Sequence, residues 1–468
     1  MATQSEITDI STIFSKTIEI IKWYYAHSEQ YPVLKYISPA ETASRIDLSI
    51  KQDGVDLDTF FGELKKIVEI SPKTSSKGFF NLLVGGKIIP VVAAEMIATA
   101  LNNTMHTYKS AGVHILIENE VIGYMLKKIG FPDWDWIFAP GGSISNMVAM
   151  IVARNEKHEN ILKEWLYGLP RMTMYVSDQW HYSIYKNANL IGVWESNVRI
   201  VKSDDQGKMD MCDLERLIVA DIAAGYTPFF IKNTAGTTVL GAFDPIDETA
   251  KIAQKYNIWL HVDAALGGTF LMSQKYKHLL QWIEWADSVA RNPHKMMNIP
   301  LLASAILIKK KWLLEKHFYE GADYLYQMTD NKSNFDLNPG GKSIQCGRRN
   351  DALKVWAWLK LFGEAWYEKR IENQVSNAQH AVEIIKNDPA LRLILPPEWI
   401  NVCFQVVWSD AASLCDYADK QGIVKVSHGQ RHWETFIRMM CVDADMTHDD
   451  IDAFFANIKK AHLAQIAA

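Results

Sequence analysis

The sequence has few cysteines, no long uncharged apolar run and no marked excess of charge of one sign. Its five cysteines are odd in number, scattered and without CxxC spacing, so neither a disulfide framework nor a zinc site is indicated, and no metal ion is expected. The formal net charge is −5 with acids and bases interspersed, which gives no basic surface for nucleic acid or anionic lipid. The most apolar stretch, KIIPVVAAEMIATAL, contains Glu95 and falls short of the roughly 18 uncharged residues of a membrane span.

A secretory signal is also missing from the N-terminal stretch MATQSEITDISTIF, which lacks a basic start and a cleavable apolar segment. We therefore expect a cytoplasmic protein that binds neither nucleic acid nor membrane. The 468 residues are 48% hydrophobic and 22% charged, which is typical of a globular protein with a sizeable core. The expected partner is a small molecule.

The pattern along the chain predicts three parts. Residues 1–74 have apolar residues at helical spacing but too few for a core of their own, so these helices are suited to embrace a second subunit. In residues 75–345, short β-rich runs alternate with helical segments, which predicts an α/β domain with a largely parallel sheet covered on both faces. Residues 346–468 begin with a long helical stretch from about Ala352 to Asn387, continue in short strands and form a smaller α+β unit. The β-rich runs of the middle part are WIFA, MTMYVS, NVRIVK, PFFIKN, IWLHVD and SAILIK.

Unusual residues stand at the ends of these runs, where parallel sheets bind their ligands. Gly142 and Ser143 open a helix after WIFAP, and backbone N–H groups at a helix start suit a phosphate, although glycines after a strand are more often plain turn residues. Asp263 ends a buried run and requires a cation or a hydrogen-bonding partner, unless it only caps a helix. Lys295, in NPHKMMNIP, has apolar neighbours, so it either extends to solvent or serves as a neutral amine.

Together these features describe a ligand with a phosphate, an aldehyde and a ring nitrogen that needs an anionic partner. Pyridoxal 5′-phosphate (PLP) has all of them. Asp263 would keep the ring nitrogen protonated, and Lys295 would hold the aldehyde covalently as a neutral amine.

Six segments carry a resemblance to a known family: GGSISNM, WHYSIYKNA, NTAGTTVLGAFDPI, HVDAALGG, NPHKMM and SIQCGRRND. They resemble the group II PLP-dependent decarboxylases of fold type I, the aspartate aminotransferase-like fold, and most of all the branch of glutamate decarboxylase and cysteine sulfinate decarboxylase. The resemblance runs from about residue 75 to the C-terminus. It implies a seven-stranded sheet domain, a homodimer with active sites at the subunit interface, and α-decarboxylation of an L-amino acid.

The resemblance also implies roles for single residues. His181 would stack on the cofactor ring, Tyr324 would protonate the substrate Cα from a mobile loop, and Arg438 would bind the substrate α-carboxylate. The plainer alternatives are a packed core histidine, an exposed loop aromatic and a surface ion-pair residue. Further residues expected at the cofactor are Gly142, Ser143, Thr238 with its neighbour Thr237, Ala265, Asn292 and His294.

The substrate side departs from glutamate decarboxylases. Aliphatic residues, Leu82 among them, replace polar ones after FFN, and Leu266 stands where the family has tryptophan. Thr104 and His106 lie in a second altered segment, where His106 is either a replacement donor to the substrate or an ordinary loop histidine. An acidic amino acid such as aspartate, cysteine sulfinate or glutamate is the first expectation, and an aromatic or other apolar one is the alternative.

Other chemistries of the same fold stay open, namely an aminotransferase, another lyase or an oxidative aldehyde synthase. A non-catalytic scaffold would require the loss of Lys295, Asp263 or His181, and all three are present.

Overall fold

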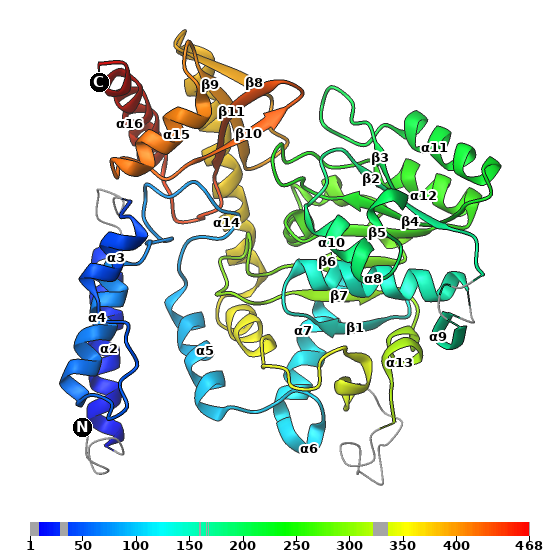
Figure 1. The fold of residues 1–468 in the computed structure, drawn as a ribbon, viewed down its shortest axis with the longest axis horizontal. Coiled ribbons are helices and arrows are strands. Elements are labelled where there is room, and N and C mark those ends of the chain that lie inside the picture. Colours follow the sequence, from blue (N-terminus) through cyan, green and yellow to red (C-terminus); the bar gives the residue numbers. More distant parts are fainter. Residues whose placement is uncertain are drawn as a thin grey trace. The chain divides into compact units, whose positions relative to one another are not determined.

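The computed structural model describes residues 9–28, 36–158, 161–164, 166, 168–321 and 336–467, which fold into two compact units. The first unit comprises Met1–Gly86, Ser376–Pro396 and Val402–Ala468, and the second comprises Lys87–Val375 and Pro397–Asn401. Figure 1 shows the elements of both. Over the described ranges, no helix combines the length and the apolar character needed to cross a membrane.

The second unit is built on a seven-stranded sheet with the strand order β1-β7-β6-β5-β4-β2-β3. Neighbouring strands from β3 to β6 pair in parallel, whereas β7 is antiparallel to both β6 and β1. The largely parallel sheet expected from the sequence is therefore confirmed. The strands are β1 (Asp135–Phe138), β2 (Met172–Ser177), β3 (Val198–Val201), β4 (Thr227–Thr234), β5 (Trp259–Ala264), β6 (Ser288–Arg291) and β7 (Ala305–Ile308).

Helices bury both faces of this sheet, which explains why its strands read as continuous apolar runs rather than alternating ones. β2 is buried along its whole length, and α8 contacts β4 to β7 while α11 and α12 contact β4. The main core lies between α8 and the sheet, where Val148 and Val152 belong to one cluster with Met174 and Phe230. The helices of the unit are α5 (Ile89–Leu101), α6 (Tyr108–Ala111), α7 (Val113–Ile129), α8 (Gly142–Lys157), α9 (Ile161–Glu164), α10 (Ser183–Leu190), α11 (Met211–Ala223), α12 (Ile246–Tyr256), α13 (Leu313–Phe318) and most of α14 (Ala352–Asn387).

Strand β6 is the one strand of this sheet that the sequence patterns did not single out. It has four residues, SVAR, of which only Val289 is a large apolar residue, so it carries little apolar signal. Its register with β5 pairs Asp263 with Ala290 and Ala264 with Arg291. This pairing places the segment that follows β6 beside the carboxyl end of β5.

The first unit contains a four-stranded sheet of order β10-β11-β9-β8, in which β10 pairs with β11 and β8 with β9, both antiparallel. The sequence indicated β9 and β11 but not β8 or β10, and β10 reads SHGQR, which has no apolar alternation. The elements are α2 (Ile10–Ser28), α3 (Pro39–Arg45), α4 (Leu57–Ile70), β8 (Leu391–Leu395), β9 (Asn401–Val406), α15 (Ala411–Lys420), β10 (Ser427–Arg431), β11 (Glu434–Met440) and α16 (His448–Ala467).

Local sequence signals account for several boundaries. Ser38 accepts a hydrogen bond from the backbone N–H of Glu41, and Pro39 occupies the first position of α3, as capping rules predict. The long α14 spans the range expected, although Gly363 interrupts it with φ 72°, a backbone angle that favours glycine. Residues 1–74 fall in the same unit as the small sheet. The division at residues 74 and 345 remains a prediction.

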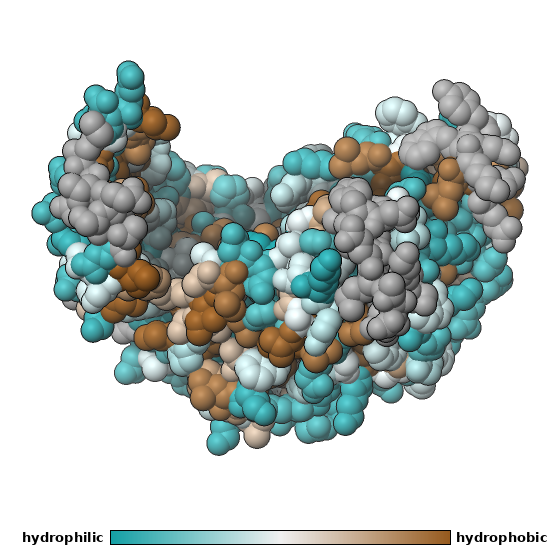
Figure 2. All heavy atoms as spheres, turned by 90° about the horizontal axis from the view of Figure 1, so that it is seen from below, coloured by the Kyte–Doolittle hydropathy of each residue, from teal (hydrophilic) through white to brown (hydrophobic). Residues whose placement is uncertain are grey.

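Large apolar side chains are also exposed, and Figure 2 shows apolar surface on the face seen from below. In the second unit, those on α5 and α7 include Ile89, Ile97, Leu101, Val113 and Leu116.

Candidate active site

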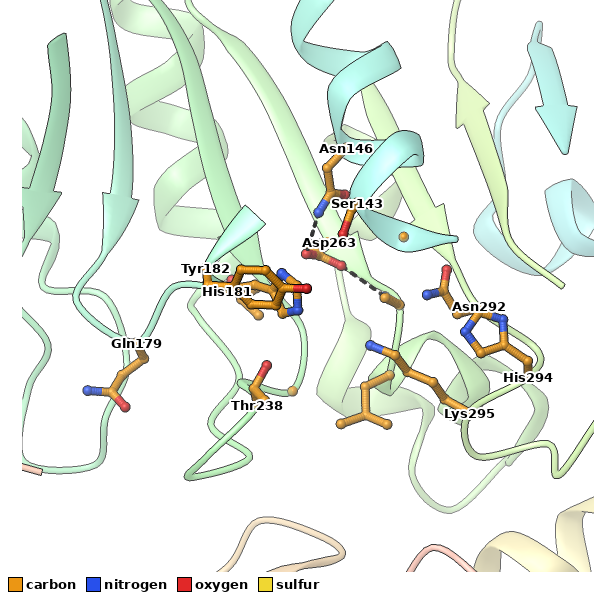
Figure 3. A pocket seen from close by; sticks show the side chains of 15 residues that line it. Ser143, Asn146, Gln179, His181, Tyr182, Thr238, Asp263, Asn292, His294 and Lys295 are labelled. Carbon is orange, nitrogen blue, oxygen red and sulfur yellow. Dashed lines mark hydrogen bonds between the residues drawn. The ribbon is translucent and has the colours of Figure 1, made fainter. Parts of the chain in front are cut away.

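A pocket of about 190 Å³ lies at the carboxyl ends of the parallel strands in the second unit. β1, β2, β4, β5 and β6 run in the same direction, so the segments that follow them meet at one edge of the sheet. Figure 3 shows the pocket from close by. The lining residues are Gly142, Ser143, Asn146, Gln179, His181, Tyr182, Thr234, Gly236, Thr238, Asp263, Ala265, Leu266, Asn292, His294 and Lys295.

The start of α8 forms one wall. Gly141, the residue before the helix, has φ 97°, which favours glycine, and no side chain caps the helix there. The first backbone N–H groups of a helix have no partner within it, and α8 has the positive end of its dipole at Gly142 and Ser143. This wall therefore suits a phosphate.

Asn292 and His294 continue that wall from the loop after β6. Ser304 Oγ donates to Asn292 Oδ1 at 2.6 Å, which leaves Nδ2 of the amide as the donor on the side of Gly142. A Cβ at Gly142 would lie only 2.7 Å from that Nδ2, so the close approach requires glycine. His294 is held through Nδ1 by the backbone of Ala303, and burial lowers its pKa to about 4, which keeps it neutral near pH 7.

Asp263, near the end of β5, is 7% exposed and ionised. Burial opposes its ionisation, but the charges of Lys232 and Lys295 outweigh this effect and hold the pKa of the carboxyl below its ordinary value. Asn146 Nδ2 donates to Oδ2 at 2.8 Å, and the backbone N–H of Ala265 donates to Oδ1 at 3.2 Å. Asp263 is thus a fixed negative charge at the pocket wall.

A chain of hydrogen bonds supports Asn146 from behind. Its Nδ2 donates to Asp263, so its Oδ1 accepts from His261 Nε2 at 3.0 Å. His261 Nδ1 then accepts from Ser288 Oγ at 2.8 Å, and Ser288 Oγ accepts from Trp259 Nε1 at 2.8 Å. Burial lowers the pKa of His261 to about 3, in agreement with a neutral ring protonated on Nε2. Each donor points along the chain toward the carboxylate.

Lys295 reaches the pocket from the loop after β6, and its Nζ points into the cavity in Figure 3. Burial lowers its pKa, Lys232 lowers it further, and Asp263 opposes both. A lowered pKa increases the fraction of neutral amine, the form that attacks an aldehyde carbon.

His181, from the loop between β2 and α10, lines the same pocket. Its Nδ1 accepts from the backbone N–H of Ser183 at 3.3 Å and lies 2.8 Å from Ser183 Oγ, so the proton is on Nε2. Burial lowers its pKa to about 4 despite the opposing charge of Asp263. A neutral imidazole can stack on a heteroaromatic ring without adding charge.

The loop after β4 brings Thr238 to the pocket, whereas Thr237 is fully buried and its Oγ1 accepts from the backbone N–H of Ala242 at 3.0 Å. The loop packs closely on Trp399. A Cβ at Gly236, where φ is 89°, would lie only 2.8 Å from the indole ring. Thr237 therefore shapes the loop rather than the pocket wall.

These residues fit PLP. Phosphate donors at α8 and at Asn292, a carboxylate at Asp263 and an amine at Lys295 line one cavity, and the Gly142 cradle has no room for a side chain. The donor set matches the phosphate, the ring nitrogen and the aldehyde of that cofactor.

Most of the residues expected at the cofactor line this pocket, namely Gly142, Ser143, His181, Thr238, Asp263, Ala265, Asn292, His294 and Lys295. Thr104 and His106 are not among the lining residues, and Thr104 Oγ1 lies 3.1 Å from His106 Nδ1. Leu82 and Arg438 belong to the first unit, where Arg438 Nη2 donates to the carbonyl of Asn81 at 2.7 Å. Tyr324 lies outside the described residues.

Sequence reasoning missed several lining residues: Asn146, Gln179, Tyr182, Thr234 and Gly236. Asn146 stands three residues after Ser143 on α8, and that helical spacing was an available signal. Gln179 and Tyr182 flank His181, so they could have been found as its neighbours.

Comparison with known proteins agrees with this site. The family model described as "Pyridoxal-dependent decarboxylase conserved domain" matches residues 39–407. The chain belongs to this family. It is 36% identical over 448 residues to the mouse (Mus musculus) protein "Cysteine sulfinic acid decarboxylase", covering 91% of this chain and 90% of that protein. It is 39% identical over 373 residues to mouse "Acidic amino acid decarboxylase GADL1", covering 80% of this chain and 68% of the relative.

The structure is also similar to one titled "Crystal structure of mouse CSAD", with a TM-score of 0.92, 33% identity and coverage of 97% of this chain and 98% of that chain. The expected branch of the group II decarboxylases and the fold type I architecture are confirmed. The protein is a PLP-dependent carboxy-lyase that acts on an amino acid.

Proposed function

We propose that this decarboxylase removes the α-carboxylate of an acidic L-amino acid, such as aspartate, cysteine sulfinate or glutamate, and releases CO2 and a primary amine. One observation carries the chemistry: the amine of Lys295, with its pKa lowered, and the ionised carboxylate of Asp263 line one pocket together with the phosphate-type wall of α8. The acidic substrate class follows from the relatives, which are named for cysteine sulfinic acid and acidic amino acids.

The bound cofactor supplies a sink for the electrons left on Cα when the bond to the carboxylate breaks. The N–H groups of Gly142 and Ser143 and the amide of Asn292 would hold its phosphate. Asp263 Oδ1 would hold a proton on the ring nitrogen, and the amine of Lys295 would hold the aldehyde. The neutral ring of His181 would orient the cofactor ring.

The substrate roles rest on the resemblance. Arg438 binds the α-carboxylate, with charged hydrogen bonds of roughly 1.5–3 kcal/mol each, and Tyr324 protonates Cα after CO2 leaves. By the same resemblance, Thr104, His106 and Leu82 are the candidates for contacting the substrate side chain.

An aromatic substrate is the second candidate, because the buried, aliphatic Leu266 lines the pocket. The test is CO2 release from a panel of purified L-amino acids, with Lys295→Met as the inactive control. We expect kcat/KM to be highest for one of aspartate, cysteine sulfinate and glutamate. Preference for phenylalanine, tyrosine or tryptophan would replace the acidic assignment, and ammonia released together with CO2 would indicate an aldehyde synthase.

We also propose a cytoplasmic homodimer in which residues 1–74 embrace the partner. The exposed large apolar side chains on α5 and α7 support this assembly, because such side chains are often covered in a complex. Light scattering should give about twice the mass of one chain, 53.3 kDa. A fully active species of single-chain mass would contradict the dimer.

A further inference from the structure

A second lysine lies behind the pocket. Lys232, on β4, is 1% exposed and does not line the cavity. Its Nζ lies 3.0 Å from Asp263 Oδ2 and 3.1 Å from Thr234 Oγ1. A buried ammonium group is tolerated when it is paired with a charge and hydrogen-bonded, and Asp263 supplies the paired charge.

The partners of Asp263 are divided between its two oxygens. Oδ2 accepts from Asn146 and forms the ion pair with Lys232, whereas Oδ1 accepts only the 3.2 Å hydrogen bond from Ala265 among the described residues. A carboxylate oxygen has two lone-pair sites, so Oδ1 retains room for one more donor. The ring nitrogen of the cofactor would be held there by Oδ1, while Lys232 is paired with the opposite oxygen.

This arrangement gives one carboxylate two positive partners when the ring nitrogen is protonated. The other titratable groups near Asp263 are Lys295 in the pocket and the neutral rings of His181 and His261. Asp244 also interacts with Lys232, but it accepts hydrogen bonds from the backbone N–H groups of Met209 and Thr234. Lys232 is therefore the buried cation fixed on the carboxylate that faces the ring.

We propose that Lys232 is a positioning residue: by sharing the charge of Asp263, it weakens the hold of that carboxylate on the ring-nitrogen proton. The inference rests on the proposed function, which places the ring nitrogen at Asp263. Without Lys232, the carboxylate and the protonated ring form a neutral pair; with Lys232, the group carries one net positive charge in a medium where charges interact strongly.

The test is the ¹⁵N NMR shift of PLP labelled at the ring nitrogen, followed against pH in the cofactor-loaded protein. Lys232→Gln removes the charge and keeps a donor for Asp263, and Lys232→Met removes both. We expect each variant to release the ring-nitrogen proton at a pH about one unit higher than the wild type, a tenfold gain in proton affinity. If Lys232→Gln does not fold, Lys232→Met provides the same measurement.

Two further variants separate the outcomes. Lys342→Met removes another lysine that is 1% exposed and that forms an ion pair with Asp135 at 3.1 Å. In this variant the ring nitrogen of PLP should titrate as in the wild type. Asp263→Asn should release the proton at a lower pH. If Asp263→Asn shifts the titration but the Lys232 variants do not, or if Lys342→Met shifts it equally, the inference is overturned and the proposed function stands. An unchanged titration in Asp263→Asn overturns the placement of the ring at Asp263.

Discussion

Replacing Gly142 with alanine should weaken cofactor binding without unfolding the protein. The new Cβ would lie 2.7 Å from Asn292 Nδ2, whereas heavy atoms in contact are usually about 3.5 Å or more apart, so the amide must move by about 0.8 Å. That movement strains the 2.6 Å hydrogen bond from Ser304 to Asn292, a loss of about 1 kcal/mol. Alanine in place of glycine in a helix offsets up to about 1 kcal/mol of this loss.

The gain from alanine in the helix does not offset the expected loss of cofactor affinity. If the displaced amide no longer contacts the phosphate, the lost charged hydrogen bond of roughly 1.5–3 kcal/mol raises the Kd for PLP about 10- to 100-fold. Kd is measured by absorbance titration of the cofactor-free protein, and stability by the urea midpoint of the same preparation. We expect the midpoint to change little.

Gly123 provides the matched control. It also lies within a helix, α7, but a Cβ there would meet nothing within 4 Å, so Gly123→Ala should leave Kd unchanged. In an Asn292→Ala background, Gly142→Ala should add little, because the group it displaces is already gone. Wild-type PLP affinity in the single Gly142→Ala variant would refute the reasoning.

Three other predictions concern the same pocket. Lys295→Met should abolish CO2 release and leave no cofactor attached after borohydride reduction, as seen by mass spectrometry; retained attachment would show that another amine binds the aldehyde. Burial lowers the pKa of His181 and of His294 to about 4, below the ordinary value of about 6.5, so the unfolded chain takes up protons first as pH falls. The contribution of the two neutral histidines to the stability of the cofactor-free protein is complete above pH 6.5 and is lost as pH falls toward 4. Burial raises the pKa of Asp244 to about 6, so the contribution of this carboxyl increases as pH falls over the same range. His181→Gln should therefore show a shallower fall in urea midpoint between these pH values, and an equal slope would contradict the assignment. Leu266→Trp fills the pocket and should lower kcat/KM for aromatic relative to acidic substrates by about tenfold; a gain for aromatic substrates would oppose this.

The sequence predicted most strands of the large sheet from their apolar runs, including the four-residue β1, β3 and β7, but missed β6, β8 and β10. PFFIKN and IWLHVD correspond to β4 and β5, whereas β6 reads SVAR and β10 reads SHGQR, and neither carries a periodic apolar signal. The residues of the site were predicted when a motif placed them at the end of a strand or just after it, as for Asp263 and Ser143. Asn146 was missed although it stands three residues after Ser143 on α8; its hydrogen bond to Asp263 depends on the packing of α8 over β5.

The two lysines near Asp263 show why register, rather than hydropathy, separates their roles. Lys232 and Lys295 both stand among apolar residues, so sequence composition does not distinguish them. In the sheet, Lys232 pairs with His261, and Thr234 pairs with Asp263, which places Lys232 on the same face but two residues, roughly 7 Å, before the strand end. Lys295 instead follows the end of β6, and its side chain enters the pocket from a loop. Lys295, beyond the end of β6, therefore reaches the cavity itself, whereas Lys232, two residues inside β4, reaches it only through the carboxylate of Asp263.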